Sequence, residues 1–461
     1  MHGIKFIHTA DLHLDTPFTG LSQWNPELAG KLKNATFNSF GRIVGLCIRE
    51  EVDFLLVAGD TFNSKNQSLA AQLKFVNELK KLSDKGIACY FVCGNHDPLS
   101  SWMDQLQLPA NVHRFGSKEA QSVTFQRNGR ALADIYGISF ETESVYDNLA
   151  QKIIHCRMGK PDPAPFQVAI MHGTAGSQGP HKKYAPFGLE EVAGQNFDYW
   201  ALGHVHKRQV LRAQKPAVVY PGNPQGRDFG ETGSRGCCLV DIREGAAPDI
   251  RFVPTQVIRF EELTVDLSGE DSINGLQKRI DAAVEAMEGP GRTDGMEHQA
   301  HMDATEPPGP SGAYRQEEAK ANYIIRLLLK GQTSLHGQLG KPGELEQLLQ
   351  VFNEGQLSRD PFTWYDSIRL ETGPELDLDQ VRQGTDFPAE VLRQAEAMAA
   401  DPQRLEEFLL EAQEAFGNPL VRRELAELTA EDRAEMAEMA KWMLLENLQT
   451  GRSEKHELND Y

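Results

Sequence analysis

The sequence predicts an α/β fold, in which a sheet with parallel strands has helices on its faces. Short apolar segments recur along the first 255 residues, helical segments separate them, and polar residues follow them. The first three apolar segments are "IKFIHTA", "DFLLVAGD" and "IACYFVCGNHD". Strands and helices that alternate at this spacing favour parallel pairing. Because such crossovers are right-handed, we expect the carboxyl ends of the strands at one edge of the sheet.

The intervening helices and the later strands follow from local patterns. Residues 26–51 have a mostly helical pattern, and residues 68–86 place Leu69, Leu73, Val76 and Leu79 at helical spacing before a stop at Gly86. The strand signals then continue through "FQVAIMHG", "FDYWALGHVH", "AVVYPGN" and "GCCLVDI". Residues 1–255 are therefore predicted to form one α/β domain.

A second, smaller α/β domain is predicted over residues 256–375. It begins with the strand-like run "VIRFEELTVDL" and resumes with "NYIIRLLLKGQT" and "WYDSIRLET". Between these runs lies a helical stripe formed by Ile273, Leu276, Ile280, Val284 and Met287. Residues 288–318 are rich in Gly and Pro with almost no apolar side chains, so we interpret them as a flexible insert.

Residues 376–461 are predicted to be helical and acidic. Two apolar stripes support this: Leu405, Phe408, Leu409, Ala412 and Phe416 in one, and Met436, Met439, Met443 and Leu444 in the other. Such stripes indicate either core packing or a docking face for a partner helix, since methionine surfaces adapt to partners. The sequence leaves both readings open.

The charge distribution permits a nucleic-acid substrate. The whole chain of 461 residues has a net charge of −19, but residues 1–255 carry 27 basic against 25 acidic side chains. The acidic excess therefore lies in the second part of the chain. Six cysteines without metal-finger spacing, no signal-peptide layout and no run of about 18 apolar residues favour a cytoplasmic protein with reduced thiols.

Polar side chains gather where the predicted strands end. They are Asp11, His13, Asp15, Asp60, Asn95, His96, Asp97, His172, His204 and His206. Each motif alone is common in turns and helix caps, but five motifs at one sheet edge, offering only nitrogen and oxygen ligands, indicate a metal site. Such ligands suit manganese, iron or zinc, or magnesium where carboxylates dominate.

Seven of these side chains are too many for one ion. Two ions that share a carboxylate use them all: Asp11, His13, Asp60 and His206 for one, and Asp60, Asn95, His172 and His204 for the other. Two such ions polarise both oxygens of an in-line displacement and activate water, which predicts hydrolysis of phosphate esters. His96 is then free to protonate the leaving oxygen, and Asp97 is expected to orient its imidazole.

The motifs "DLH", "GD", "GNHD", "HG" and "GHVH", in this order, resemble those of the calcineurin-like metallophosphoesterase superfamily. Within it, "FIHTADLHLD", "GDTFN" and "VCGNHDP" resemble the SbcD-type DNA repair exonucleases, and "GPHKKYAPF" and "YPGNPQGRDFGETGSRGC" resemble their YhaO-like branch. The resemblance implies two mixed β-sheets sandwiched by helices, a small capping domain and C-terminal helices. It also implies a manganese-dependent nuclease, a tendency to form a homodimer, and an SMC-like coiled-coil ATPase that binds the C-terminal helices.

The chain departs from the family pattern at two positions. Asp15 stands where SbcD-type enzymes usually have Gly, and Asp228 stands where the YhaO-like branch is expected to have His. Basic side chains in the loops after the metal-bearing strands are candidates for contacts with substrate phosphates, with ordinary solvated surface as the alternative. They are Lys182, Lys183, Lys207, Arg208, Arg227 and Arg235.

These observations favour one function and leave two alternatives. The leading hypothesis is a DNA exonuclease or endonuclease subunit that acts in repair through metal-activated water. One alternative is a phosphodiesterase or phosphatase that acts on nucleotides or small esters. The other is a scaffold that binds DNA ends or an ATPase, with weak catalysis. A protein phosphatase is disfavoured because "GDTFNSKNQ" lacks the Asp-Arg-Gly that those enzymes carry there.

Overall fold

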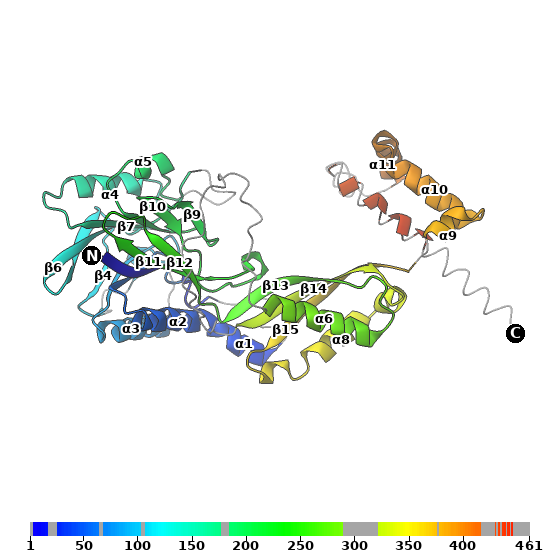
Figure 1. The fold of residues 1–461 in the computed structure, drawn as a ribbon, viewed down its shortest axis with the longest axis horizontal. Helices are drawn as coiled ribbons and strands as arrows, with labels where there is room; N and C mark the ends of the chain where they lie inside the picture. Colours follow the sequence, from blue (N-terminus) through cyan, green and yellow to red (C-terminus); the bar gives the residue numbers. More distant parts are fainter. Residues whose placement is uncertain are drawn as a thin grey trace. The chain divides into compact units, whose positions relative to one another are not determined.

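The computed structural model describes residues 3–16, 25–63, 68–102, 107–176, 184–288, 321–375 and 378–415, and short stretches between 429 and 445. These residues belong to two compact units (Figure 1). The first comprises Met1–Glu262, Thr293–Ile325 and Phe352–Asp366, and the second comprises Leu263–Arg292, Arg326–Val351 and Ser367–Tyr461. Almost all of the expected insert lies outside the described residues, and the three-domain division stays a prediction.

The first sheet of the first unit has six strands in the order β12-β11-β1-β2-β3-β4. Strands β1 to β4 pair in parallel, while β11 pairs antiparallel with both β1 and β12. Their bounds are β1 Gly3–Thr9, β2 Phe54–Ala58, β3 Ala88–Val92, β4 Val112–Arg114, β11 Gly236–Arg243 and β12 Asp249–Pro254. The three polar motifs that follow β1, β2 and β3 therefore emerge at the same edge.

The second sheet also has six strands, in the order β5-β6-β7-β8-β10-β9. Strands β6, β7, β8 and β10 run parallel, and the two edge strands pair antiparallel with their neighbours. The bounds are β5 Gln121–Arg127, β6 Arg130–Gly137, β7 Phe166–His172, β8 Tyr199–Gly203, β9 Gln209–Arg212 and β10 Ala217–Tyr220. Both sheets are mixed, as the family resemblance predicted.

The two sheets face each other across an apolar core, and helices cover their outer sides (Figure 1). The inner core includes Phe6, Phe54, Ile135, Val168 and Tyr199. Apolar side chains of α2 (Ala35–Arg49) and α3 (Leu69–Ser83) pack on the outer side of the first sheet. Those of α4 (Leu149–Met158) and α5 (Leu189–Ala193) pack on the second. Strands buried on both sides read as continuous apolar runs, which is why the sequence predicted them.

Local signals set where several helices begin. The side chain of Asn25 caps α1 (Pro26–Lys33), Ser68 caps α3, and Asn148 caps α4. Short 3-10 helices occur at η2 Leu99–Ser101, η3 Phe229–Glu231 and η4 Gln356–Ser358. The predicted helix over residues 26–51 is two helices, because Asn34 lies between α1 and α2.

A three-stranded sheet follows the sandwich in the chain, in the order β13 (Ile258–Asp266), β14 (Asn322–Gln332) and β15 (Thr363–Gly373). The helices beside it in sequence are α6 Ile273–Glu288, α7 His336–Leu339 and α8 Glu344–Asn353. The strand segments predicted on both sides of the insert therefore belong to one sheet.

The remaining described elements are the helices α9 (Leu378–Gln383), α10 (Phe387–Ala399) and α11 (Pro402–Ala415). Leu392 and Leu445 are the buried centre of a small apolar cluster there. On α11, Leu405 is buried whereas Phe408 is 51% exposed. Phe416, Met439 and Met443 lie outside the described residues, so the choice between core and docking face stays a prediction. Among the described helices, none is both long and apolar enough to cross a membrane.

Candidate metal centre

The seven predicted ligands lie at one edge of the sandwich, where strands of both sheets end. Asp11 and His13 follow β1, Asp60 follows β2, and Asn95 follows β3 in the first sheet. His172 ends β7, and His204 and His206 follow β8 in the second. Short hydrogen bonds connect these loops, because the amides of Asp11 and His13 donate to the carbonyls of Gly59 and Asp60 at 3.0 Å. The fold thus assembles one site from five separate motifs.

Several of the predicted ligand residues have a left-handed backbone. The φ angles are +53° at Asp11, +43° at His13, +50° at Asp60 and +103° at His204. Such conformations cost about 1–3 kcal/mol each in residues other than Gly, and they persist where the surroundings impose them. Asp15, which stands where the family usually has Gly, also has a φ of +69°. Asp tolerates this region better than most residues, which explains why the replacement is accommodated.

Two glycines make room for the ligand side chains. A Cβ atom on Gly59 would lie 2.4 Å from Nδ1 of His172, and one on Gly94 would lie 2.2 Å from Oδ1 of Asp60. Real carbon atoms do not approach so closely, so any larger residue would displace a ligand. The small residues beside the polar motifs are therefore required by close packing as well as by the turns.

One group of possible ligands consists of Asp11, His13 and His206, whose ligand atoms lie within 4.8 Å of one another. The Nε2 atoms of His13 and His206 are 3.0 Å apart. Nδ1 of His206 is 2.7 Å from the carboxylate of Glu231, so it carries the proton and Nε2 keeps its lone pair. Two nitrogens at about 2.1 Å from one ion and at right angles to each other are roughly 3.0 Å apart. The pair therefore fits a shared cation.

A second group consists of Asp11, Asp60 and His172. Nδ1 of His172 donates to the carbonyl of Ala58 at 3.0 Å, which leaves the lone pair on Nε2. That Nε2 lies 3.1 Å from Oδ1 of Asn95 and 3.5 Å from Oδ2 of Asp60. The same Asp60 oxygen is 3.9 Å from Nε2 of His13 in the first group. Asp60, a member of the second group, therefore also lies near a nitrogen of the first group, and Asp11 belongs to both groups.

His204 contacts both groups in a different way. Its backbone amide donates to both oxygens of Asp11, at 3.0 and 3.1 Å. Its ring packs edge-on against the ring of His172, with the centroids 5.2 Å apart. Asp11 is itself close to both groups, whereas the sequence assigned it to one ion only.

The electrostatics of the site favour cations. Burial, together with the neighbouring Asp60 carboxylate, raises the pKa of Asp11 well above its usual range. Burial lowers the pKa values of His13 and His172, so their imidazoles are neutral ligands near neutral pH. Nδ1 of His13 has no hydrogen-bond partner within the part of the chain that the structure describes. Buried carboxylates beside neutral imidazoles fit divalent metal ions, whose charge offsets the cost of burying the carboxylates.

The structure gives Asp97 partners other than the imidazole of His96. His96 is exposed, its ring packs edge-on against that of His13 at 5.0 Å, and its Nδ1 lies 3.0 Å from the carbonyl of Asn63. The buried carboxylate of Asp97 instead accepts the amides of Gly94 and Thr61, at 2.8 and 3.0 Å. We expected Asp97 to hold the imidazole of His96. The structure shows it bridging two ligand loops, because two backbone amides occupy its oxygens.

The predicted phosphate-binding side chains have different surroundings. Lys182 and Lys183 lie outside the described residues, and Lys207 is exposed after β8. The guanidinium of Arg208 lies over the ring of Phe252, 5.2 Å from its centroid, so it packs on β12. Arg235 donates to the carbonyl of His206 at 2.5 Å, which fixes the backbone of that ligand.

The guanidinium of Arg227 lies inside the site, next to three other residues. Its guanidinium is 2.8 Å from Glu231, 3.2 Å from Oδ1 of Asn63 and 3.1 Å from Nδ1 of His206. Asp228, the second departure from the family pattern, is exposed and caps η3 by accepting the amide of Gly230 at 2.8 Å. Binding of substrate phosphates by these basic side chains stays a prediction.

Sequence reasoning missed Glu231 and Asn63. Glu231 follows a glycine in a polar turn, a pattern that many solvated loops share, and Asn63 lies a few residues beyond the "GD" motif. Burial opposes ionisation of Glu231, but hydrogen bonds from His206 and Arg227 outweigh it and hold its pKa well below the usual range. Neither residue carries a local signal, because both act on groups that are distant in sequence.

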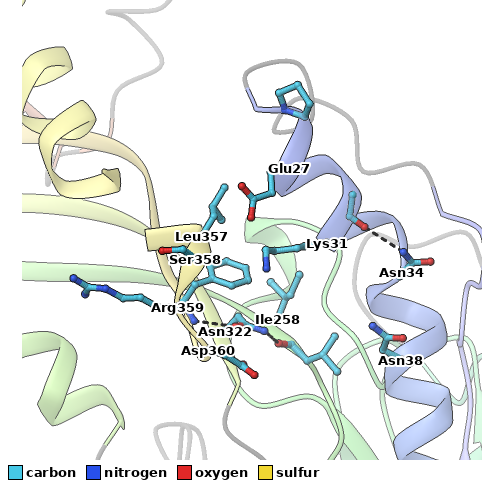
Figure 2. Close-up of a pocket in the computed structure, with 14 residues that line it drawn as sticks. Glu27, Lys31, Asn34, Asn38, Ile258, Asn322, Leu357, Ser358, Arg359 and Asp360 are labelled. Atoms are coloured by element: carbon cyan, nitrogen blue, oxygen red, sulfur yellow. Dashed lines mark hydrogen bonds between the residues drawn. The ribbon is translucent and has the colours of Figure 1, made fainter. Parts of the chain in front are cut away.

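A separate cavity of about 730 Å³ lies elsewhere in the first unit (Figure 2). Its walls carry two acidic and two basic side chains, Glu27, Asp360, Lys31 and Arg359. Asn322 joins two of its walls, since its side chain donates to the carbonyl of Val257 and accepts the amide of Phe362, both at 2.9 Å. The lining includes none of the predicted metal ligands.

Residues 4–208 match the family model of the calcineurin-like phosphoesterases. The span includes all seven predicted ligands. The chain is also 33% identical over 377 residues to the uncharacterized metallophosphoesterase YhaO of Bacillus subtilis (strain 168), covering 81% of this chain and 83% of that protein. The chain belongs to the calcineurin-like metallophosphoesterase family and is a metal-dependent phosphoesterase.

More distant relatives are named as nucleases or repair proteins. The chain is 25% identical over 303 residues to the DNA double-strand break repair protein Mre11 of Methanopyrus kandleri, covering 60% of this chain and 62% of that protein. It is 22% identical over 271 residues to a component of the nuclease SbcCD of Bacillus subtilis, covering 52% of this chain and 67% of that component. Enzymes of this family use two divalent metal ions, which agrees with the two ligand groups of the site.

Proposed function

We propose that this protein is a DNA-directed phosphodiesterase, an exonuclease or endonuclease subunit that acts in DNA repair. The observation that carries the proposal is that Oδ2 of Asp60 lies near an imidazole nitrogen of each group, 3.5 Å from Nε2 of His172 and 3.9 Å from Nε2 of His13. Two relatives, named as a DNA repair protein and as part of a nuclease, support DNA as the substrate. The near-neutral balance of charge in residues 1–255 is compatible with a polyanion.

We assign the metal ligands as Asp11, His13, Asp60 and His206 for one ion, and Asp60, Asn95, His172 and His204 for the other. Manganese is the proposed metal, with magnesium, iron or zinc as alternatives. Two divalent ions held there supply a nucleophile from water and neutralise charge on the phosphate. His172 and His206 present unprotonated Nε2 atoms, because their Nδ1 atoms bear the protons.

His96 is the proposed general acid. Its ring is exposed next to the ligand His13, where a leaving oxygen can reach it. Its Nδ1 donates to the carbonyl of Asn63, so Nε2 is the atom that faces a substrate and exchanges a proton with the leaving group. Asp97 acts indirectly, because it holds the loops that carry Asp60 and Asn95.

The test is manganese-dependent hydrolysis of linear DNA by the purified chain, compared with a small phosphodiester. We expect wild-type cleavage of DNA and a loss of about 10²-fold or more in turnover for His96→Ala, with both ions retained. Elemental analysis of the same samples checks the metal content. DNA left intact while the small diester is hydrolysed would favour the small-ester alternative. Near-normal turnover of the variant would remove His96 from the reaction.

The partners belong to the same proposal. We propose that the chain forms a homodimer and that its C-terminal helices bind an SMC-like coiled-coil ATPase, with residues 256–375 as a capping domain. The exposed Phe387 and Phe408 on α10 and α11 support a docking role. Deletion of residues 387–461 should leave hydrolysis within about twofold and abolish association with such an ATPase. If hydrolysis collapses, those helices belong to the catalytic unit.

A further inference from the structure

We propose that the ion pair between Arg227 and Glu231 is a positioning device that serves both halves of the catalytic centre. Through Glu231 it orients the metal ligand His206, and through Asn63 it orients His96. The inference rests on the proposed metal ligands and on the proposed role of His96. Arg227 and Glu231 act through these two histidines and do not contact the reacting groups themselves.

Glu231 is the centre of a dense set of contacts. One carboxylate oxygen accepts Nδ1 of His206 at 2.7 Å and Nη2 of Arg227 at 2.8 Å. The other accepts the side-chain amide of Asn223 at 2.8 Å and the backbone amide of Arg227 at 2.9 Å. An oxygen with this many donors is fixed in direction, so it holds the imidazole ring in one orientation.

The carboxylate also selects the tautomer of His206. An ionised carboxylate only accepts hydrogen bonds, so Nδ1 of His206 must donate, and its lone pair lies on Nε2, facing His13. The guanidinium of Arg227 and Nδ1 of His206 are 3.1 Å apart because both donate to the same oxygen. Glutamine at position 231 keeps one acceptor oxygen but turns an NH2 group toward donors, either His206 and Arg227 or Asn223 and the Arg227 amide, so the arrangement would be disturbed.

Arg227 extends the arrangement toward His96. Its Nη1 donates to Oδ1 of Asn63 at 3.2 Å. The backbone carbonyl of Asn63 in turn lies 3.0 Å from Nδ1 of His96. The Arg227 side chain is only 18% exposed. One guanidinium therefore ties the carboxylate behind His206 to the residue behind His96.

The fold holds the pair in place through the turn that carries it. Asp228 caps η3, so that Arg227 and Glu231, four residues apart, face the same side. The ring of Phe229 packs edge-on against Phe260 of β13, with the centroids 5.3 Å apart. The turn is thus capped within itself and packed against β13, which suits a positioning role.

The first experiment is a Mn²⁺ titration of the purified full chain, followed by calorimetry, with no substrate present. We expect two binding events in the wild type, and in Glu231→Gln a loss of about 10- to 100-fold in the affinity of one of them. Glu231→Asp should recover part of the loss, because the charge returns. Both affinities within threefold of wild type in Glu231→Gln would overturn the role of Glu231.

Glu191→Gln is the matched control. Glu191 on α5 also accepts two side-chain amides, from Asn148 and Gln151, and its carboxylate contacts neither ligand group. We expect both Mn²⁺ affinities to be unchanged in this variant. Equal losses in the Glu191 and Glu231 variants would mean that general destabilisation, and not positioning, explains the result. A wild type that binds no Mn²⁺ would instead remove the proposed metal centre itself.

The second experiment tests the connection from Arg227 through Asn63 to His96. Arg227→Lys keeps a positive charge beside Glu231 but cannot span both Glu231 and Asn63. We expect Mn²⁺ affinities within threefold of wild type, a fall of about tenfold or more in kcat and little change in KM. An increase in KM with kcat preserved would show that Arg227 binds substrate, and unchanged kinetics would overturn the connection to His96.

Discussion

Both ends of the β-sandwich bury aspartates, but the partners of these carboxylates differ between the two ends. At the carboxyl ends of the strands, within the described residues, the side chains that form ion pairs with Asp11 and Asp60 are histidines. At the other end, the buried Asp134 pairs with Lys160 at 2.6 Å, and Asp198 pairs with Lys215 at 2.5 Å. Asp134 also accepts the hydroxyl of Thr124 and an amide.

The pKa values follow this difference in compensation. Burial acts on Asp134 as it does on Asp11, but hydrogen bonds from Lys160 and Thr124 outweigh it and lower the pKa of Asp134. The pKa of Asp11 is raised, because burial and the neighbouring Asp60 act in the same direction. A buried carboxylate whose charge the protein balances serves the fold. A buried carboxylate whose charge the protein does not balance, and which lies beside neutral imidazoles, indicates that a bound metal cation balances it.

The largest expected effect is at the unbalanced end. Asp60→Ala should lose both ions and reduce hydrolysis by about 10³-fold or more, because one side chain lies between both ligand groups. Elemental analysis after gel filtration gives the metal content, and a phosphodiester assay gives the rate. Two ions retained per chain would refute the bridging assignment.

The balanced end should show the reverse pattern. Asp134→Asn removes the charge that pairs with Lys160, so the free energy of unfolding should fall by about 3 kcal/mol. Metal content and hydrolysis should stay near wild type while the protein is folded. Urea unfolding measures the first quantity, and elemental analysis measures the second. If the variant loses metal but not stability, the contrast between the two ends is wrong.

A smaller effect concerns the buried histidine His8. Its Nδ1 is paired to the hydroxyl of Tyr199 at 3.0 Å, and burial lowers its pKa from 6.5 to about 3. Between about pH 3 and pH 6.5, the unfolded chain therefore binds a proton at His8, whereas the folded protein does not. Its effect on stability is absent above about pH 7, and stability is lost progressively as the pH falls from about 6.5 toward 3.

At pH 5 this cost is about 2 kcal/mol. His8→Gln keeps a polar side chain next to Tyr199 but has no titrating group. Between pH 7 and pH 5, the wild type should therefore lose about 2 kcal/mol more unfolding free energy than the variant. Urea unfolding in the presence of a chelator measures both, since the ligand histidines contribute equally to each protein. Parallel pH profiles would show that His8 does not titrate in this way.

Much of the site could be predicted from the sequence because its residues lie at the ends of strands. Strands such as "DFLLVAGD" are continuous apolar runs, and a parallel sheet brings their carboxyl ends together. Asp60, His172 and His206 could therefore be grouped from local patterns alone. The confirmed predictions are the family and the two mixed sheets with covering helices. The local patterns predicted a sheet with helices on its faces, and the family resemblance implied the two mixed sheets.

Contacts between distant loops were not predictable in this way. Asp97 was expected to hold His96, but its oxygens accept backbone amides whose positions depend on how two loops turn. Glu231 reaches His206 across 25 residues, through a turn whose letters resemble those of any polar loop. Side-chain pairing of this kind depends on three-dimensional distance, and sequence spacing does not encode it.

The sequence by itself determined the types and the order of the candidate ligands and the α/β fold that carries them, because apolar runs and turn residues act through near neighbours. Only the tertiary structure decided which groups share a space. It placed the carboxylate of Asp60 near nitrogens of His13 and His172, and it placed Arg227 next to His206 and Asn63. It also paired the carboxylate of Asp134 with Lys160, whereas the charge of Asp11 is left unbalanced. Electrostatic energy depends on distance and on burial, and both exist only once the two sheets have packed.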